Sequence, residues 1–381
     1  MAIEENIPII SSNLASILEL SKGQLLASLE TLGQPKYRAE QLWRAIYREG
    51  RTSFEDMTNL SKDLRGVLSQ NYSIGNAITV LSKQSADAST DKILFKLPDG
   101  ELIETVLMRY EADGHRRGRK TVCVSTQAGC ALGCTFCATG QQGFRRNLTT
   151  GEITEQVLTM ERLARSEDEK EIEAGTRSRG ELQGVTNVVF MGMGEPLANY
   201  ENMMEAIRIL NDPKGIGIGA RHITVSTVGL VPGIEKLATE DVQINLAVSL
   251  HAPDNETRSE TMPVNKRYPI EQLIEACQYF VKKTNRRIFI EYVLLKGQND
   301  TPLHASKLGR VLKDLLCHVN LIPVNPTGEG PYRRTEYREA QRFQSDLKKF
   351  NVPSTVRMEK GIDINAGCGQ LRERAIEILD N

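Results

Sequence analysis

From residue 121 onward, short apolar segments with strand character alternate with longer amphipathic segments with helical periodicity. The helical spacing is clearest in one apolar stripe, which comprises Ile270, Leu273, Ile274, Cys277, Phe280 and Val281. The strand candidates are short, apolar and largely β-branched, and they are 121–127, 187–192, 222–227, 244–250, 287–295 and 318–324.

Repeated strand–helix units predict a parallel sheet with helices packed outside it, because parallel strands need long crossover connections. Six such units favour an α/β fold built as a partial (β/α)6 barrel. A doubly wound open sheet remains possible on this pattern alone. In either architecture, ligands bind at the carboxyl ends of the strands.

The residues before this region have a different character. Residues 1–77 show leucine-rich helical periodicity and predict an N-terminal helical accessory domain. Residues 78–120 contain strand-like segments, and Pro98-Asp99-Gly100 suits the turn of a hairpin. We therefore expect a β-hairpin extension at 78–120 that leads into the barrel, and a barrel domain that spans 121–381 and ends in a cysteine-bearing loop.

One segment inside the barrel region is almost entirely polar or charged, at residues 165–183. Such a composition has little apolar surface to bury. We interpret the segment as a solvated, disordered insertion between a helix and the second strand, and we assign it no function.

The charge balance excludes attachment to nucleic acid or membrane by overall charge. The chain has 381 residues with 48 Lys+Arg against 49 Asp+Glu, a formal net charge of -1, so only local basic patches can attract phosphates. No apolar run approaches the roughly 18 residues of a membrane span, and the first residues are acidic where a signal peptide is basic. We expect a cytoplasmic protein with no membrane partner.

Three cysteines form a compact motif, Cys130-x3-Cys134-x2-Cys137, directly after the first strand candidate. Thiolates are the usual ligands of iron–sulfur clusters, and closely spaced cysteines on one loop can hold such a cluster. Three ligands leave one iron of a four-iron cluster open to a small molecule. Zinc is the alternative metal, but it prefers four closed ligands, and the sequence has no second CxxC.

Polar residues also follow the predicted strands where the fold class places ligand contacts. A carboxylate suits an ammonium group or ribose hydroxyls, and small hydroxyls and amides suit a nucleoside. Any of these residues taken alone could instead be a cap or turn residue. The candidates for cofactor binding are Gly194, Glu195, Ser226, Ser249, Leu250, His251 and Asn325.

The cysteine motif, with Phe136 before its last cysteine, resembles the signature of the radical S-adenosylmethionine (SAM) superfamily. Together with ATGQQGF (138–144), GIDINAGCGQL (361–371) and the ETV of 104–106, the chain resembles the RlmN family of dual-specificity RNA adenine carbon-2 methyltransferases over nearly its whole length. The resemblance implies one four-iron, four-sulfur (4Fe-4S) cluster on Cys130, Cys134 and Cys137, and two SAM molecules per turnover.

The resemblance also implies roles for three further residues. Cys368 is expected to become an S-methylcysteine, Glu104 to accept the carbon-2 proton, and Cys123 to resolve a covalent enzyme–RNA adduct by a transient disulfide with Cys368. Read alone, Cys123 could be an ordinary strand thiol, and Glu104 has no distinguishing signal. The sequence departs from the family at Gly367, where an alanine is expected before the catalytic cysteine.

The partners implied by the resemblance are 23S rRNA before full ribosome assembly and tRNA, with a flavodoxin-type electron donor and a monomeric enzyme. Local basic and aromatic residues fit contacts to phosphates and unpaired bases; they lie at 115–120, 144–146, 332–334 and 337–338, and in the helical domain at Lys36, Arg38, Arg44, Arg48 and Arg51.

Two alternatives remain open from the sequence. One is a Cfr-type enzyme that methylates carbon 8 of adenosine; Pro196 and the QQGF of 141–144 favour carbon 2. The other is a non-catalytic RNA-binding module stabilised by a structural metal.

Overall fold

A single ten-stranded sheet organises the molecule, in the order β14-β13-β12-β11-β10-β9-β6-β5-β4-β3. The computed structural model describes residues 14–112, 114, 117–176, 178, 183–325, 331–357 and 360–371. The parallel part of the sheet consists of β6 (Arg119–Cys123), β9 (Asn187–Phe190), β10 (Ile223–Thr227), β11 (Asn245–Ser249), β12 (Ile288–Leu294), β13 (Cys317–Pro323) and β14 (Ser354–Val356).

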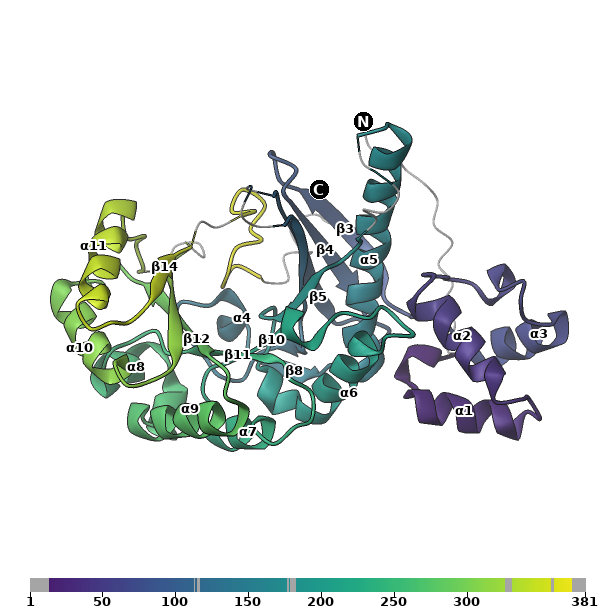
Figure 1. Ribbon diagram of the computed structural model, residues 1–381, viewed down its shortest axis with the longest axis horizontal. Helices are drawn as coiled ribbons and strands as arrows, with labels where there is room; N and C mark the ends of the chain where they lie inside the picture. The colour runs from purple at the N-terminus through teal and green to yellow at the C-terminus, as the bar shows by residue number, and fades with distance from the viewer. Residues whose placement is uncertain are drawn as a thin grey trace.

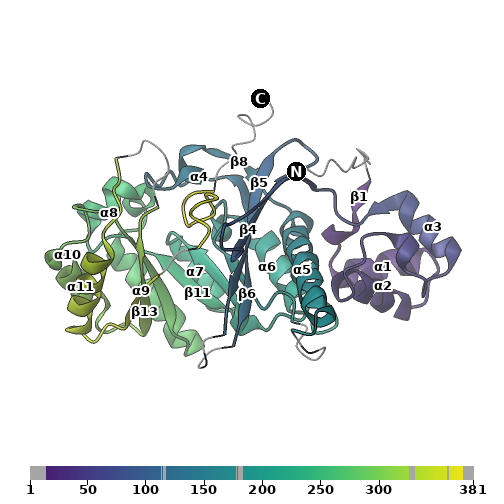
Figure 2. The same cartoon turned by 90° about the horizontal axis from the view of Figure 1, so that it is seen from above.

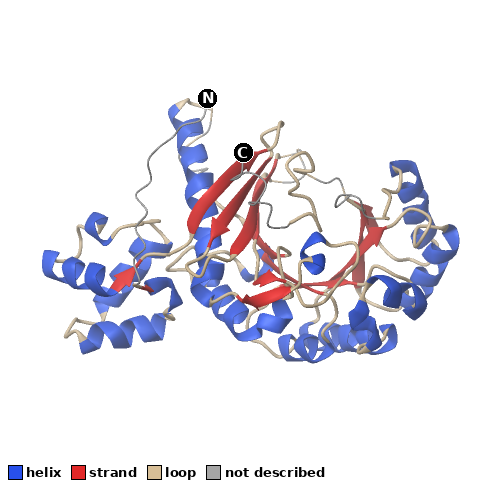
Figure 3. Ribbon diagram, turned by 180° about the vertical axis from the view of Figure 1, so that it is seen from behind, coloured by secondary structure: helices blue, strands red, loops and turns tan. Residues whose placement is uncertain are grey.

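All six strand candidates thus form neighbouring parallel strands in chain order, which confirms the (β/α)6 prediction. The strand order never reverses, so the sheet has no switch point of a doubly wound fold. The sheet curves with helices on its convex side (Figure 3) and stays open between its edge strands β14 and β3, as a partial barrel does. Sequence analysis missed β14, a strand of three residues.

The helices on the outer side of the sheet are α5 (Thr150–Glu173), α6 (Tyr200–Asn211), α7 (Val231–Leu237), α8 (Asn255–Thr261), α9 (Ile270–Thr284), α10 (Pro302–Leu312) and α11 (Tyr337–Lys348). Their apolar faces form the core with the strands. On α9, the predicted stripe provides the buried Leu273, Cys277 and Phe280. Short 3-10 turns lie at Pro196–Asn199, Ala220–His222 and Pro263–Lys266.

The predicted hairpin extension continues the barrel sheet in antiparallel fashion through β3 (Ile78–Gln84), β4 (Thr90–Lys96) and β5 (Leu102–Tyr110). The turn at Pro98-Asp99-Gly100 connects β4 to β5, and Gly100 adopts the positive φ of +91° that glycine tolerates. Strand β5 pairs with β6, so that Val106 lies opposite Cys123. The extension therefore forms one wall of the barrel interior.

The first described residues form a helical lobe beside the barrel (Figures 1 and 2). It has its own apolar core around Trp43, Tyr47 and Leu68, and Leu158 of α5 and Ile209 of α6 join that core. The lobe contains α1 (Lys22–Thr31), α2 (Tyr37–Tyr47), α3 (Lys62–Asn71), a parallel pair β1 (Ala15–Ser16) and β2 (Tyr72–Ser73), and 3-10 turns at Ile17–Glu19 and Phe54–Asp56.

The prediction of a disordered insertion at 165–183 is wrong for its first half, because α5 continues to Glu173. Asp168 is fully buried, and its carboxylate lies 2.7 Å from Nζ of Lys120 on β6. The carboxylate also accepts a backbone N–H from Gly184 at 3.0 Å. A charged side chain is retained in the interior here because it is paired and hydrogen-bonded. Residues 177 and 179–182 lie outside the described residues.

Within the described part of the chain, no helix is both long enough and apolar enough to cross a membrane.

Candidate active site

The three motif cysteines lie on one loop between β7 (Gln127–Gly129) and the short helix α4 (Ala138–Gln141). Strand β7 pairs with β8 (Phe144–Asn147), and this two-stranded ribbon closes the base of the loop. Gly129 has a φ of +72°, and a Cβ there would clash with the carbonyl oxygen of Gly143. The amide of Cys130 donates to that same oxygen at 2.8 Å. The glycine thus permits the turn that presents Cys130.

The thiols of this loop lie close enough to interact electrostatically. Burial raises the pKa of Cys130 to about 11, with a contribution from Cys137. Burial also raises the pKa of Cys134, with contributions from Cys137 and Cys130. Metal coordination is what would stabilise such thiolates, since iron–sulfur clusters bind cysteine as the thiolate.

The donor set fits an iron–sulfur cluster, because three thiols share one loop and thiolates are the usual ligands of such clusters. A four-iron cluster binds each thiolate on a different iron, so its cysteines need not converge on one point. Cys130, Cys134 and Cys137 are therefore the residues that would hold a 4Fe-4S cluster.

Arg258 is a site residue that sequence analysis missed. Its side chain is fully buried, and its guanidinium donates to the carbonyl oxygens of Leu250 at 3.1 Å and Val228 at 2.5 Å. The positive charge partly offsets the rise in the pKa of Cys134 that burial causes. Arg258 thus ties two strand ends together beside the cysteine loop. A lone arginine in the polar stretch of α8 gives no sequence signal for this role.

Glu195 lies at the end of β9 with both carboxylate oxygens engaged. One oxygen accepts the amide of Leu197 at 3.0 Å, and the other accepts the amide of Val228 at 2.8 Å. Burial raises the pKa of Glu195 to about 7, and its charge in turn raises the pKa values of Cys130 and Cys134. The carboxylate therefore stands next to the cysteine loop, where an ammonium group would relieve the cost of its burial.

The preceding residue is conformationally constrained. Gly194 has a φ of +98°, and a Cβ there would come within 2.5 Å of Cβ of Gln127. The side chain of Gln127 in turn accepts the amide of Glu195 at 2.8 Å. A glycine is therefore needed at position 194, because the backbone there passes close to Gln127. This close approach positions Glu195.

The other candidates for cofactor binding lie at the same edge of the sheet. Ser226 is in β10, Ser249 ends β11, and Leu250 and His251 follow it directly. His251 has a φ of +55°, its Nδ1 accepts the amide of Val293 at 3.0 Å, and burial lowers its pKa to about 3, so the ring is neutral. The ring meets Phe136 edge-on at 5.0 Å. Each residue lies where it was predicted; its contact with a cofactor stays a prediction.

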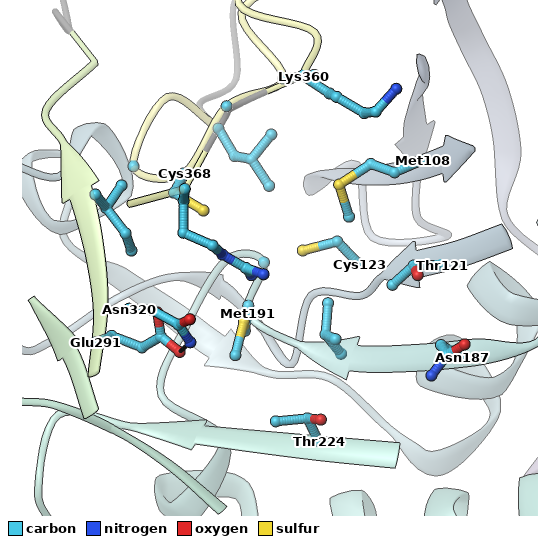
Figure 4. A pocket seen from close by; sticks show the side chains of 18 of the residues that line it. Met108, Thr121, Cys123, Asn187, Met191, Thr224, Glu291, Asn320, Lys360 and Cys368 are labelled. Atoms are coloured by element: carbon cyan, nitrogen blue, oxygen red, sulfur yellow. Dashed lines mark hydrogen bonds between the residues drawn. The ribbon is translucent and has the colours of Figure 1, made fainter. Parts of the chain in front are cut away.

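A cavity of about 370 Å³ inside the barrel brings together the two remaining cysteines that the sequence analysis singled out. Cys123 from β6 and Cys368 from the C-terminal loop line it, as does the cluster-loop residue Cys137. Figure 4 shows the thiols of Cys123 and Cys368 directed toward each other across this space. Burial raises the pKa of Cys123 to about 12, and the charge of Cys368 contributes. None of the seven cysteines, all of them described, is in a disulfide.

The loop that carries Cys368, residues 360–371 (the C-terminal loop), is attached to the cluster loop. The amide of Ala138 donates to the carbonyl oxygen of Gly369 at 2.8 Å, and the hydroxyl of Thr139 donates to that of Leu371 at 2.6 Å. Asn325 donates its side-chain amide to the carbonyl oxygen of Cys368 at 3.4 Å. Asn325, predicted to bind cofactor, therefore supports the C-terminal loop.

The departure at Gly367 has a structural reason. A Cβ at this position would come within 2.5 Å of Nδ2 of Asn325 and 2.8 Å of Oε1 of Gln370. These two side chains occupy the space that an alanine methyl group would need. The glycine therefore fits the way the loop is packed in this chain.

Glu104 is buried on β5 but is not among the described residues that line the cavity. Its carboxylate lies 2.8 Å from Nζ of Lys92. Side chains two residues apart on a strand share a face, so Glu104 shares the face of Val106, the cross-strand neighbour of Cys123. Glu104 therefore lies near Cys123, two residues along β5 from the residue that pairs with it.

Comparison with known proteins identifies this class of site. A family model described as the radical SAM superfamily matches residues 124–307, and one described as the N-terminal domain of ribosomal RNA large subunit methyltransferases matches residues 15–74. The fold and the cysteine loop therefore define a radical SAM enzyme.

Relatives narrow the class to one family. The chain is 46% identical over 364 residues, 95% of this chain and 94% of the relative, to a probable dual-specificity RNA methyltransferase RlmN of Staphylococcus haemolyticus, and equally identical to that of Staphylococcus aureus. A solved radical SAM methyltransferase from Sphaerobacter thermophilus is also 46% identical, covers 94% of this chain and 99% of its own, and has a TM-score of 0.86. The chain belongs to the RlmN family of radical SAM RNA methyltransferases.

Proposed function

We propose that this enzyme methylates carbon 2 of adenosine in both 23S rRNA and tRNA, through an S-methylcysteine at Cys368 and a transient covalent adduct with the RNA. The observation that supports this best is the pair Cys123 and Cys368, which face one cavity together with Cys137. Two facing thiols beside a cluster site suit a reaction in which one sulfur carries carbon and the other releases it.

The adenine carbon is electrophilic, so it cannot attack a sulfonium methyl group as a nucleophile. A 4Fe-4S cluster held by Cys130, Cys134 and Cys137, together with SAM, would supply the one-electron chemistry for activating the S-methyl group and for accepting the electron that the adduct releases. Cys368 holds the carbon that becomes bonded to the base. Glu104 accepts the proton from carbon 2.

Release requires Cys123. Its thiolate forms an S–S bond with Cys368 while the bond between the Cys368 sulfur and the new carbon breaks. The electron pair stays on the carbon, which takes a proton and becomes the methyl group. An external dithiol then reduces the disulfide. Burial keeps Cys123 as the thiol in the resting enzyme, which slows premature disulfide formation, since the thiolate is the attacking species.

The decisive experiment is nucleoside analysis after reaction. Anaerobically reconstituted enzyme is incubated with SAM, reductant and each RNA, and the digested nucleosides are resolved by mass spectrometry. We expect 2-methyladenosine from both RNAs, and loss of both products when the gene is deleted. The appearance of 8-methyladenosine would overturn the carbon-2 assignment, and a protein that neither binds iron nor cleaves SAM would be the metal-stabilised binding module instead.

A basic groove of about 440 Å³ adjoins the cavity at the end of the barrel where the strands begin. Asn245 and Phe289 line both the groove and the cavity. Arg221 and Arg287 line the groove, and no acidic side chain is among its described lining residues. Cations beside a partly exposed aromatic ring suit phosphates and an unpaired base. We include this groove in the proposed RNA path.

The helical lobe remains a second proposed RNA contact. Lys36, Arg44 and Arg51 are exposed there. They make only long surface pairs, such as Lys36 with Glu30 at 3.6 Å and Arg44 with Glu49 at 3.5 Å. Exposed pairs of this kind contribute little to stability and leave the cations available for phosphate.

Replacing two of the three groove arginines, Arg221→Gln with Arg287→Gln, should weaken RNA binding about tenfold. The slope of log affinity against log salt should flatten by roughly 1.4, since each lost contact to single-stranded RNA accounts for about 0.7. Fluorescence anisotropy at several salt concentrations measures both quantities. Arg310→Gln on α10, outside the groove, is the control. Equal affinities and slopes for all three proteins would remove the groove from the RNA path.

A further inference from the structure

Lys92 of β4 lies on the same face of the extension as Glu104 and Val106. It is directly opposite Val106 in the β4–β5 pairing, while Glu104 is opposite Leu94. The Lys92 and Glu104 side chains are therefore diagonal neighbours on one face, with only 11% and 5% of their surfaces exposed. Their charged atoms are 2.8 Å apart. Lys92 and Glu104 thus form a nearly buried ion pair. In the sheet, Val106 lies between Lys92 and Cys123.

The same ammonium also reaches the C-terminal loop. Nζ of Lys92 donates to the backbone carbonyl oxygen of Asn365 at 3.2 Å, three residues before Cys368. Elsewhere, Asp363 of this loop accepts the amide of Ala86 at 2.9 Å, and Lys360 lies 5.2 Å from the ring of Tyr110. The extension is thus the platform on which the loop rests, and Lys92 is the contact that also binds Glu104.

We propose that Lys92 is a positioning residue for methyl transfer: one ammonium holds the Glu104 carboxylate and the Asn365 carbonyl, and so fixes the proton acceptor relative to the loop that carries Cys368. This inference rests on the proposed function, in which Glu104 accepts the carbon-2 proton. Lysine suits the role because its ammonium is a compact charge with three donors that can point to different acceptors.

The proposal predicts which step depends on Lys92. Methylation of Cys368 does not use Glu104, and the contacts of Gly369 and Leu371 with the cluster loop hold the loop without Lys92. Removal of the base proton does use Glu104. A misplacement of about 1 Å can cost about 100-fold in rate, so Lys92 should affect the second step and spare the first.

The test compares Lys92→Met with the wild type in separate assays. Mass spectrometry should show Cys368 methylated within twofold of the wild-type level, while RNA methylation falls about 100-fold and the covalent protein–RNA adduct accumulates on denaturing gels. Lys92→Arg, which keeps the charge, should restore part of the rate. Lys96→Met, which removes an exposed lysine of the same strand, should turn over normally.

A double-mutant cycle separates positioning from a general loss of structure. If Lys92 acts through Glu104, then Lys92→Met should slow a Glu104→Gln enzyme little further. Multiplying effects, or full activity of Lys92→Met, would overturn the inference. Wild-type enzyme that makes no methyladenosine would instead refute the proposed function, and a fully active Glu104→Gln would refute the role of Glu104.

Discussion

Cys123→Ala is expected to trap the enzyme on its RNA. The variant should still methylate Cys368 and still form the carbon–carbon bond to adenine, because neither step uses the Cys123 sulfur. It cannot form the S–S bond that releases the product. Multiple turnover should fall below about 1% of wild type, a loss of the size seen when a group that forms a covalent intermediate is removed. Denaturing gels with labelled RNA should show a retarded band that nuclease removes.

The controls use the other cysteines of the chain. Cys368→Ala should give neither the S-methyl group nor the adduct, since no sulfur is left to carry the carbon. Cys317→Ala, which changes a buried thiol of the sheet core, should form and resolve the adduct normally. Turnover of Cys123→Ala at the wild-type rate would show that another group releases the product.

Six of the parallel strands could be predicted because helical periodicity separates most of them and their apolar residues form nearly continuous runs. Strand β14 was not predicted, because a strand of three residues is too short to show a recognisable hydrophobic pattern. The extension of α5 escaped for a different reason. The charged residues of this segment indicated exposure to solvent. In the structure, Asp168 lies four residues after the buried Ala164 on the same helix face and pairs with Lys120, which is 48 residues away in the sequence. Composition alone does not reveal such a pairing.

The candidate site likewise contains residues that the sequence predicts and residues that it does not. The three cysteines of the cluster loop could be predicted because their spacing is local, whereas Cys368 was predicted only through the family resemblance. The contacts of Arg258 and Lys92 could not be predicted from the sequence. Each is a single basic residue, and its contacts depend on burial and on partners from other strands and loops. Glu195 was found as a ligand candidate, yet its two bonds to backbone amides give it a structural task as well.

These contacts indicate what the antiparallel extension contributes to the site. Sequence analysis treated it as a lead into the barrel. In the structure it provides Glu104, the pairing that fixes Cys123 and the surface that holds the C-terminal loop. A partial barrel has an open side, and here the extension and the C-terminal loop bring functional groups to it from sequence positions more than 200 residues apart.

Loss of any one cluster ligand should abolish the radical chemistry that activates the S-methyl group. Cys134→Ala exchanges a buried thiol for a slightly smaller apolar methyl group, so the fold should persist. The remaining two thiolates cannot hold the cluster, and SAM cleavage should fall at least about 1000-fold, as expected when the group that carries the chemistry is removed. Iron and sulfide content, the EPR signal after reduction, and 5′-deoxyadenosine formation measure the loss independently of RNA.

Cys277→Ala is the matched control, because Cys277 is also fully buried but packs in the core through α9. It should keep the cluster and the activity, and unfold with a stability loss of only about 1 kcal/mol from the small cavity. If Cys134→Ala retained iron and methylated RNA as well as Cys277→Ala, the three-cysteine cluster site would be refuted. If both lost the cluster, the effect would be one of folding, and Cys130→Ala and Cys137→Ala, which change less buried thiols, would separate ligand loss from core damage.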